Sequence, residues 1–168
     1  PEYLKEKLER ADAQIDRLSR VISHMGVFSR KSELEAAPFD PYDACEGAVA
    51  LLGESLTQQG ISLECRPPAQ RVVVRGYADQ LEQVLINLLA NARDALLGRA
   101  DEGARWVGVS QEPCTDTGWV ELHVRDNAGG IDLAVIERIF EAFFTTKPVG
   151  KGTGLGLSVS HDLIRNMG

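Results

Sequence analysis

The sequence predicts an α+β domain that follows one long amphipathic helix. Apolar residues recur at helical spacing in several segments, and other short segments alternate apolar and polar residues as strands do. Turn residues separate these segments, and helical and strand patterns are mixed along the chain. This mixture is typical of the α+β class.

Size and composition are those of one compact soluble domain with a helical extension. Of the 168 residues, 43% are hydrophobic and 26% are charged, and no apolar stretch is long enough to cross a bilayer. We therefore expect a cytoplasmic piece that makes no membrane contact. The net charge of -7 argues against unspecific binding to nucleic acid. Cys45, Cys65 and Cys114 are widely spaced, which favours reduced thiols over disulfides or a zinc site.

Residues 1–33 predict a long helix with a heptad seam. Its apolar residues alternate between spacings of four and three, and charged residues occupy most positions between them. The seam consists of Leu4, Leu8, Ala11, Ile15, Leu18, Ile22 and Met25. We expect it to pair with a second chain in a coiled coil or four-helix bundle, although packing on its own domain would also cover it. Residues 36–41 break the pattern, so we place a boundary between units 1–35 and 36–168.

A helix, two short strands and a second long helix are expected next. Residues 43–59 form a helical pattern that points Ala44, Ala48, Leu51, Leu52 and Leu56 inward. Residues 61–65 and 72–74 suit strands, and two prolines follow the first of them. The helical pattern of residues 77–97 ends at Gly98, and its buried side comprises Leu81, Val84, Leu85, Leu88, Leu89, Ala92 and Leu96.

The last third of the chain predicts a hairpin and two helical segments. Residues 106–110 and 119–125 alternate as strands, and residues 116–118 supply turn chemistry between them. Residues 132–144 have helical character, and residues 155–167 return to helix after a glycine-rich interruption.

Polar residues on the second long helix form the first candidate site. Asn87 and Asn91 are four apart, so their amides project from one face, and Asp94 follows about one turn later. An amide oxygen is a hard ligand suited to Mg²⁺, which takes its remaining ligands from water and phosphates. Two solvated asparagines are the alternative interpretation.

The segment DNAGGI, residues 126–131, follows the second strand of the predicted hairpin. The Asp126 carboxylate can accept a hydrogen bond from an exocyclic amine such as that of adenine, and the small residues after it let a base approach the backbone. A tight turn that begins with aspartate is the alternative.

A glycine-rich segment with two lysines opens directly into the last helix. Lys147 and Lys151 stand near Gly150, Gly152, Gly154 and Gly156. Free amides at a helix start and nearby lysines can bind phosphate, and the glycines allow the motion of a lid. The spacing fits neither the P-loop nor the GxGxxG pattern, and a flexible surface loop is the alternative.

These segments together resemble the sensor histidine kinases. Residues 87–94, 126–131, 140–144 and 152–156 are similar, in order, to the N, first glycine, phenylalanine and second glycine boxes of that family. The run FFTTKPVGKGTGLGLSVSH is especially similar to the nitrogen-regulation and dicarboxylate-sensor branch. The resemblance covers the whole chain, and residues 1–35 resemble the second helix of the dimerisation and phosphotransfer hairpin.

The resemblance implies a Bergerat fold, a two-layer α/β sandwich with a mixed sheet, that binds ATP and Mg²⁺ under a lid. It implies that Asn91 ligates magnesium, that Asn87 lies near the phosphates, that Asp126 holds the adenine amine and that Gly130 admits the base. Lys147 joins the two asparagines as a catalytic residue. The ATP site would further include Asp94, Ile131, Thr145, Thr146, Lys151, Gly152, Thr153, Gly154, Leu155 and Gly156, and the lid would be anchored by Phe140, Phe143 and Phe144.

Three departures from the family pattern qualify this expectation. Ala128 stands where the family often has glycine, and the family continues beyond Gly168 into a closing strand pair, so we expect a piece truncated at its C-terminal end. His24 lacks the context of a phosphoacceptor, and His123 and His161 are no better placed. We therefore expect the acceptor histidine on a helix outside this sequence.

The function implied is a protein-histidine kinase that serves a two-component system. Its implied partners are a response regulator receiver domain and a second copy of the chain, paired through the heptad helix. One alternative is an ATP-hydrolysing relative, but such proteins carry glutamate at the position of Asn87, and an amide cannot act as that base. The other alternative is a nucleotide-binding scaffold without turnover.

Overall fold

A computed structural model describes residues 35–101, 103–114, 118–148 and 152–167, without the side chains of Pro113 and Cys114. The expected heptad helix, His24, Lys151 and most of the expected hairpin turn lie outside the described residues. No helix in the described part of the chain is both long and apolar enough to span a membrane.

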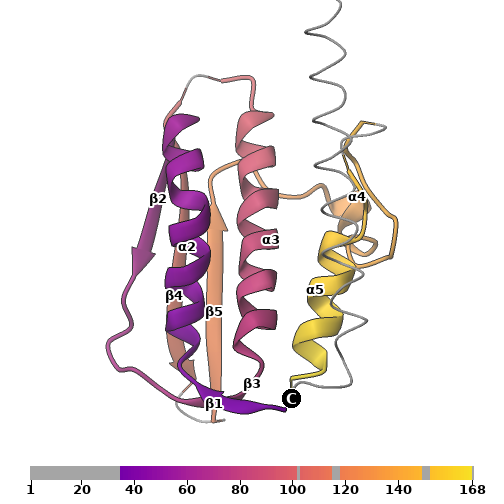
Figure 1. Ribbon diagram of the computed structural model, residues 1–168. Helices are drawn as coiled ribbons and strands as arrows, with labels where there is room; N and C mark the ends of the chain where they lie inside the picture. The colour runs from indigo at the N-terminus through magenta and orange to yellow at the C-terminus, as the bar shows by residue number, and fades with distance from the viewer. Residues whose placement is uncertain (1–34, 102, 115–117, 149–151, 168) are drawn as a thin grey trace, which may run out of the picture.

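Two helices cover one face of a three-stranded mixed sheet (Figure 1). The strands are β2 (Ile61–Arg66), β4 (Arg105–Cys114) and β5 (Trp119–Asp126), in the order β2-β4-β5. β4 pairs parallel with β2 and antiparallel with β5. Helices α2 (Pro41–Gln58) and α3 (Ala78–Leu97) form the second layer. The predicted hairpin and the two-layer fold with a mixed sheet are thus confirmed.

A separate antiparallel ribbon joins β1 (Ala37–Phe39) to β3 (Val74–Gly76) near the starts of α2 and α3. The first strand falls in the segment expected to be an irregular break, and the second begins where the expected strand 72–74 ends. The second strand lies later in the chain than expected because its residues pair with β1. Ala37 opposes Gly76, and this register determines which residues of the two strands are hydrogen-bonded. Val73 is left outside the ribbon and is 71% exposed.

Helix α2 begins at Pro41 and is capped by Asp40. The Asp40 carboxylate accepts a hydrogen bond of 2.9 Å from the backbone N–H of Tyr42, and Pro41 occupies the first turn, where its missing N–H costs nothing. The prediction that Leu51 points inward is wrong, since this residue is 63% exposed. Cys45 is buried instead, so the buried side of the helix includes Cys45 and does not include Leu51.

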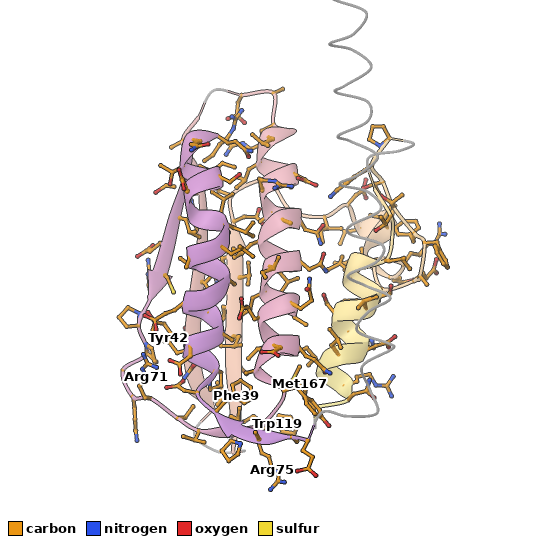
Figure 2. All side chains as sticks on the ribbon, viewed as in Figure 1. Phe39, Tyr42, Arg71, Arg75, Trp119 and Met167 are labelled. Atoms are coloured by element: carbon orange, nitrogen blue, oxygen red, sulfur yellow. The ribbon has the colours of Figure 1, made fainter. Side chains whose placement is uncertain are left out.

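Arg71 ties the loop after β2 to the start of α2. Its guanidinium donates to Asp40 Oδ2 at 3.0 Å, to the Asp43 carboxylate and to Glu46 Oε2 at 3.4 Å, and it lies 4.8 Å from the centre of the Tyr42 ring. Figure 2 labels Arg71 beside Tyr42 at this end of the domain. The contacts hold the ribbon end of the fold, away from the candidate site.

Helix α3 lies between two apolar clusters. Its residues Leu81, Leu85, Leu89, Ala92 and Leu96 are buried in the main cluster, which also contains residues of α2, β2 and β4. Val84 belongs to a smaller cluster with Val159 and Leu163 of α5 (Gly156–Arg165), and Leu88 packs against it. In Figure 1, α5 runs alongside α3 in the opposite direction. The buried side predicted for residues 77–97 is therefore shared between these two clusters.

The helix expected over residues 132–144 is a single turn, α4 (Leu133–Ile136), followed by successive turns. Asp132 caps it by accepting a hydrogen bond of 2.9 Å from the N–H of Ala134. A longer helix is excluded at Phe143, whose φ of 67° lies in the left-handed region and whose N–H donates to the Gly154 carbonyl at 2.8 Å. Pairing with the glycine loop thus replaces the helical hydrogen bonds.

Candidate functional site

Lys147 joins the glycine-rich segment to helix α3. Its ammonium lies 2.6 Å from Asp94 Oδ2 and 3.4 Å from Asn91 Oδ1. Asp94 also accepts a hydrogen bond of 2.8 Å from the Arg93 guanidinium through its other oxygen. Three residues that the sequence assigned to one site are therefore in contact, although Lys147 is distant from the other two in the chain.

The charge of Asp94 is stabilised by these contacts. Burial raises the pKa of the carboxyl, but hydrogen bonds from Lys147 and Arg93 outweigh burial and hold the pKa below its ordinary value. The carboxylate is therefore ionised at neutral pH, and together with the Asn91 amide oxygen it already faces one cation, the lysine ammonium. A hard cation that prefers oxygen ligands suits the same two groups.

Asn87 is held on the neighbouring turn of α3. Its Nδ2 donates a hydrogen bond of 2.8 Å to Oγ of Ser160 on α5. A Cβ atom at position 156 would lie only 2.5 Å from Asn87 Oδ1, so this close approach of α5 requires Gly156. Ser160 was not predicted from the sequence, because a serine among apolar residues on a helix gives no signal of a distant partner.

The glycine loop presents the start of α5 to the same region. Among the described residues, no side chain caps the start of α5, and amides at a helix start can bind an anion. Gly154 has φ of 65°, and a Cβ there would overlap the backbone of Phe143. Within the loop, Thr145 Oγ1 accepts from the N–H of Lys147 at 3.2 Å, and Thr153 Oγ1 accepts from that of Leu155 at 3.3 Å.

The DNAGGI segment forms an exposed turn after β5. Asp126 Oδ1 accepts a hydrogen bond of 2.8 Å from the N–H of Ala128, and Gly129 and Gly130 have φ of 108° and 87°. The turn predicted as an alternative is therefore present, and it does not exclude ligand binding, because Asp126 remains exposed at its start. Ile131 is 52% exposed beside it.

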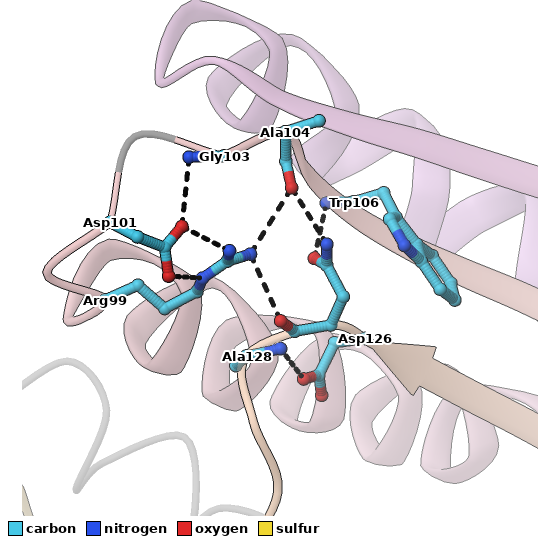
Figure 3. A network of polar contacts seen from close by, with 8 residues as sticks. Arg99, Asp101, Gly103, Ala104, Trp106, Asp126 and Ala128 are labelled. Atoms are coloured by element: carbon cyan, nitrogen blue, oxygen red, sulfur yellow. Dashed lines mark hydrogen bonds and ion pairs between the residues drawn. The ribbon is translucent and has the colours of Figure 1, made fainter.

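Asn127 and Arg99 fix this turn to the rest of the domain (Figure 3). The Asn127 side chain donates to the Ala104 carbonyl at 2.8 Å and accepts from the N–H of Trp106 at 3.0 Å. Arg99, just after α3, donates to the Asn127 carbonyl at 3.1 Å and pairs with Asp101. Neither supporting role was predicted, because each depends on backbone carbonyls that the fold brings near.

The remaining predicted residues are placed with fewer contacts. Thr146 is exposed, Gly152 lies against the side chain of Thr145, and Lys151 is outside the described residues. Of the three aromatic residues expected to anchor the lid, Phe140 lies 5.1 Å from the His161 ring and Phe144 packs under Arg138 at 4.3 Å. Phe143 is 75% exposed, so its side chain makes no such anchor.

Comparison with known proteins gives consistent matches. A family model described as "Histidine kinase-, DNA gyrase B-, and HSP90-like ATPase" matches residues 76–168. The two-component sensor PprA of Pseudomonas aeruginosa is 68% identical over 99% of this chain, and the C4-dicarboxylate transport sensor protein DctB of the same organism is 31% identical over 96%. The chain spans 18% of the length of PprA and 26% of that of DctB.

The fold has a counterpart among solved structures. The catalytic domain of histidine kinase ThkA, in a nucleotide-free form, superimposes with a TM-score of 0.66 and 26% sequence identity. The match covers 80% of this chain and 82% of the ThkA domain, so it includes most of both.

Proposed function

This chain belongs to the histidine kinase-, DNA gyrase B- and HSP90-like ATPase family, as a catalytic ATP-binding domain of a two-component sensor kinase, and from this premise we propose its reaction. The domain binds ATP with Mg²⁺ and transfers the γ-phosphoryl group to a histidine on a helix that is not part of this sequence. The phosphoryl group then passes to the receiver domain of a response regulator.

The observation that carries this proposal is the amide at position 87. The Asn87 side chain donates to Ser160 and packs against Gly156, both of them residues of α5. An amide cannot accept a proton from water, so this position cannot supply a general base for hydrolysis. Catalysis by such a site depends on positioning and on stabilising the charge of the transferred group, and the acceptor brings its own nucleophile.

ATP is held by residues from three segments in this proposal. The exposed carboxylate of Asp126 accepts a hydrogen bond from the adenine amine, and Gly130 lets the base approach the backbone. Amides at the start of α5 bind phosphate oxygens. Lys147 leaves its partners on α3 and closes over the phosphates with the rest of the glycine loop.

Magnesium fits the oxygen atoms that Lys147 contacts. The Asn91 amide oxygen would be the protein ligand, and Asp94 lies close enough to support bound water. The bound ion supplies positive charge that neutralises the phosphate oxygens. The cation already present at this position, the Lys147 ammonium, supports the fit because it faces the same two oxygen groups.

The partners belong to the same proposal. Residues 1–33 pair with a second copy of the chain through their heptad seam, and this helix lies outside the described residues. The similarity to PprA, which is named a two-component sensor, supports a response regulator as the recipient of the phosphoryl group.

Calorimetry with ATP in Mg²⁺ and in EDTA tests binding, and phosphate transfer to a supplied kinase hairpin carrying the acceptor histidine tests function. We expect magnesium-dependent binding and labelling of the hairpin. Asn91→Ala should abolish magnesium-dependent ATP binding, whereas Asn166→Ala, at an exposed asparagine near the end of α5, should leave binding unchanged. Absence of binding contradicts the proposal, binding without transfer favours a scaffold, and rapid ATP hydrolysis without the hairpin favours the hydrolysing relatives.

A further inference from the structure

Helices α3 and α5 pack through an apolar cluster and one polar contact. Val84 of α3 meets Val159 and Leu163 of α5 in a buried cluster, and Leu88 and Leu155 pack against it. Beside this cluster, Asn87 of α3 donates its 2.8 Å hydrogen bond to Ser160 of α5. Ser160 thus lies between two residues of the apolar cluster, and its hydroxyl contacts the site residue Asn87.

The hydroxyl of Ser160 is placed unusually for a helix. Ser160 is only 7% exposed, and in the described part of the chain Gln111 is the only other buried polar or charged residue. Burying a hydroxyl costs free energy unless it is hydrogen-bonded, and a serine within a helix commonly bonds to its own backbone. Here the hydroxyl accepts a hydrogen bond from another helix, so packing alone does not account for its presence.

Gly156 confines the same amide from a second side. A Cβ atom at this position would lie 2.5 Å from Asn87 Oδ1 and 2.9 Å from Nδ2, both closer than real contacts of a Cβ atom. The Asn87 amide therefore packs directly on the backbone at the start of α5 while Ser160 holds its nitrogen. Together the two contacts determine where the amide stands before any nucleotide binds.

We propose that Ser160 is a positioning residue that holds the Asn87 amide ready for bound nucleotide. The inference rests on the proposed function, in which Asn87 lies beside the phosphates of ATP. Ser160 is buried behind Asn87 and acts only through it. Without the hydroxyl, the asparagine side chain samples other rotamers, and fixing it again on binding reduces the affinity for nucleotide.

The contact can be tested without nucleotide by measuring hydrogen exchange of the Asn87 side-chain NH₂ with NMR. We expect Ser160→Ala to accelerate this exchange several-fold. Ser158→Ala is the matched control, because Ser158 is a half-buried serine of the same helix whose hydroxyl donates to the Leu155 carbonyl at 3.0 Å. Equal exchange rates in the Ser160→Ala and unmodified chains would overturn the contact, whether or not the protein binds ATP.

The role in binding is tested by titrating Mg²⁺ and ATP into the 168-residue chain. Removing one neutral hydrogen bond should weaken binding by about fivefold in Ser160→Ala. The same substitution should have no effect in an Asn87→Ala background, since the serine acts through the asparagine. An equal loss in both backgrounds overturns the proposal. If the unmodified chain does not bind Mg²⁺ and ATP, the proposed function fails; if it binds and Ser160→Ala binds equally well, only this inference fails.

Two further variants keep the test decisive if an alanine variant folds poorly or Asn87→Ala abolishes binding. Ser160→Thr keeps the hydroxyl oxygen, whereas Ser160→Cys keeps the size but accepts hydrogen bonds weakly. We expect the threonine variant to bind Mg²⁺ and ATP like the unmodified chain and the cysteine variant to bind about fivefold more weakly. Equal affinities of these two variants would contradict the positioning role.

Discussion

Lys147 of the glycine-rich segment forms an ion pair with Asp94 of helix α3, with 2.6 Å between Nζ and Oδ2. The pair connects the segment proposed as a lid to the helix that carries both site asparagines. Its side chains are 34% and 26% exposed, so water screens it only in part, and we expect it to contribute about 1 kcal/mol or less to closing the segment.

Loss of this pair should loosen the glycine-rich segment in the nucleotide-free protein. Lys147→Met keeps the aliphatic stem but removes the charge, so hydrogen exchange of residues 145–155 is expected to rise by up to about fivefold. Hydrogen exchange with mass spectrometry measures the change. Arg66→Met is the control, because it removes an exposed ion pair with Glu64 on β2. Unchanged protection in Lys147→Met would show that the ion pair does not restrain the segment.

The ion pair should also make protection of this segment depend on pH in the acid range. The pKa of Asp94 is lowered in the folded protein, so its contribution is complete above the unfolded value of about 3.9 and is lost as pH falls through the lower folded value. Exchange of residues 145–155, corrected for the intrinsic rate, should therefore rise below about pH 4. In Asp94→Asn this rise should be absent, and a persistent rise would assign it to other carboxyl groups.

Gly154→Ala should be far more damaging than Gly118→Ala. Both glycines have positive φ, 65° and 69°, but a Cβ at Gly154 would overlap the Phe143 backbone, whereas the space around Gly118 is open. The left-handed conformation alone costs an alanine about 1–2 kcal/mol, and the overlap adds displacement of the loop. ATP titration and thermal unfolding measure both effects. Similar losses in the two variants would mean that the close contact at Gly154 is unimportant.

Arg99→Ala should weaken ATP binding although Arg99 lies outside every predicted motif. Its guanidinium holds the Asn127 carbonyl at 3.1 Å, and through it the turn that presents Asp126. Losing a charged hydrogen bond of this kind costs about 1.5–3 kcal/mol, part of which should appear as reduced affinity. Arg71→Ala, which removes the contacts at the other end of the domain, should lower thermal stability without changing affinity. Equal affinities of all three proteins would contradict the role of Arg99.

Cys45 should resist thiol reagents in the folded protein. Burial, with a smaller effect of Cys65, raises the pKa of its thiol to about 12, so very little thiolate forms at pH 8. In a chain with Cys65→Ala and Cys114→Ala, reaction with a thiol reagent should follow unfolding. Because the folded pKa is raised, the stabilising effect is complete below the unfolded pKa and is lost between about pH 9 and pH 12. Rapid labelling of the native chain at pH 8 would contradict this account.

Periodicity and motif order predicted the α+β class, the helices α2 and α3, the hairpin and the family. They did so because a helix such as α3 has an apolar face set by its own residues. Local patterns could not predict β1 or the position of β3, because those strands exist only through their pairing. The helix expected over residues 132–144 failed for a related reason, since Phe143 bonds to Gly154 instead of continuing the helix.

At the site, sequence reasoning predicted Asn91, Asp94 and Lys147, which the fold brings into contact. It missed the residues that act through others. Ser160 and Arg99 have no distinguishing neighbours in sequence, and their partners are an amide on another helix and a carbonyl in a distant turn. Such contacts depend on the tertiary arrangement, so a single sequence gives no pattern from which to infer them.

Because α3 lies between two apolar clusters, this helix and the part of the glycine-rich segment around Lys147 are held by different kinds of contact and can move independently. The backbone of α3 that carries the site residues is held by both clusters, so this helix moves only when one of them comes apart. Leu155 at the end of the glycine-rich segment packs against the smaller cluster, whereas the part of the segment around Lys147 is attached to α3 by polar contacts and can detach there. Its sequence can therefore change to adjust how quickly nucleotide enters and leaves, while the asparagine helix keeps its place.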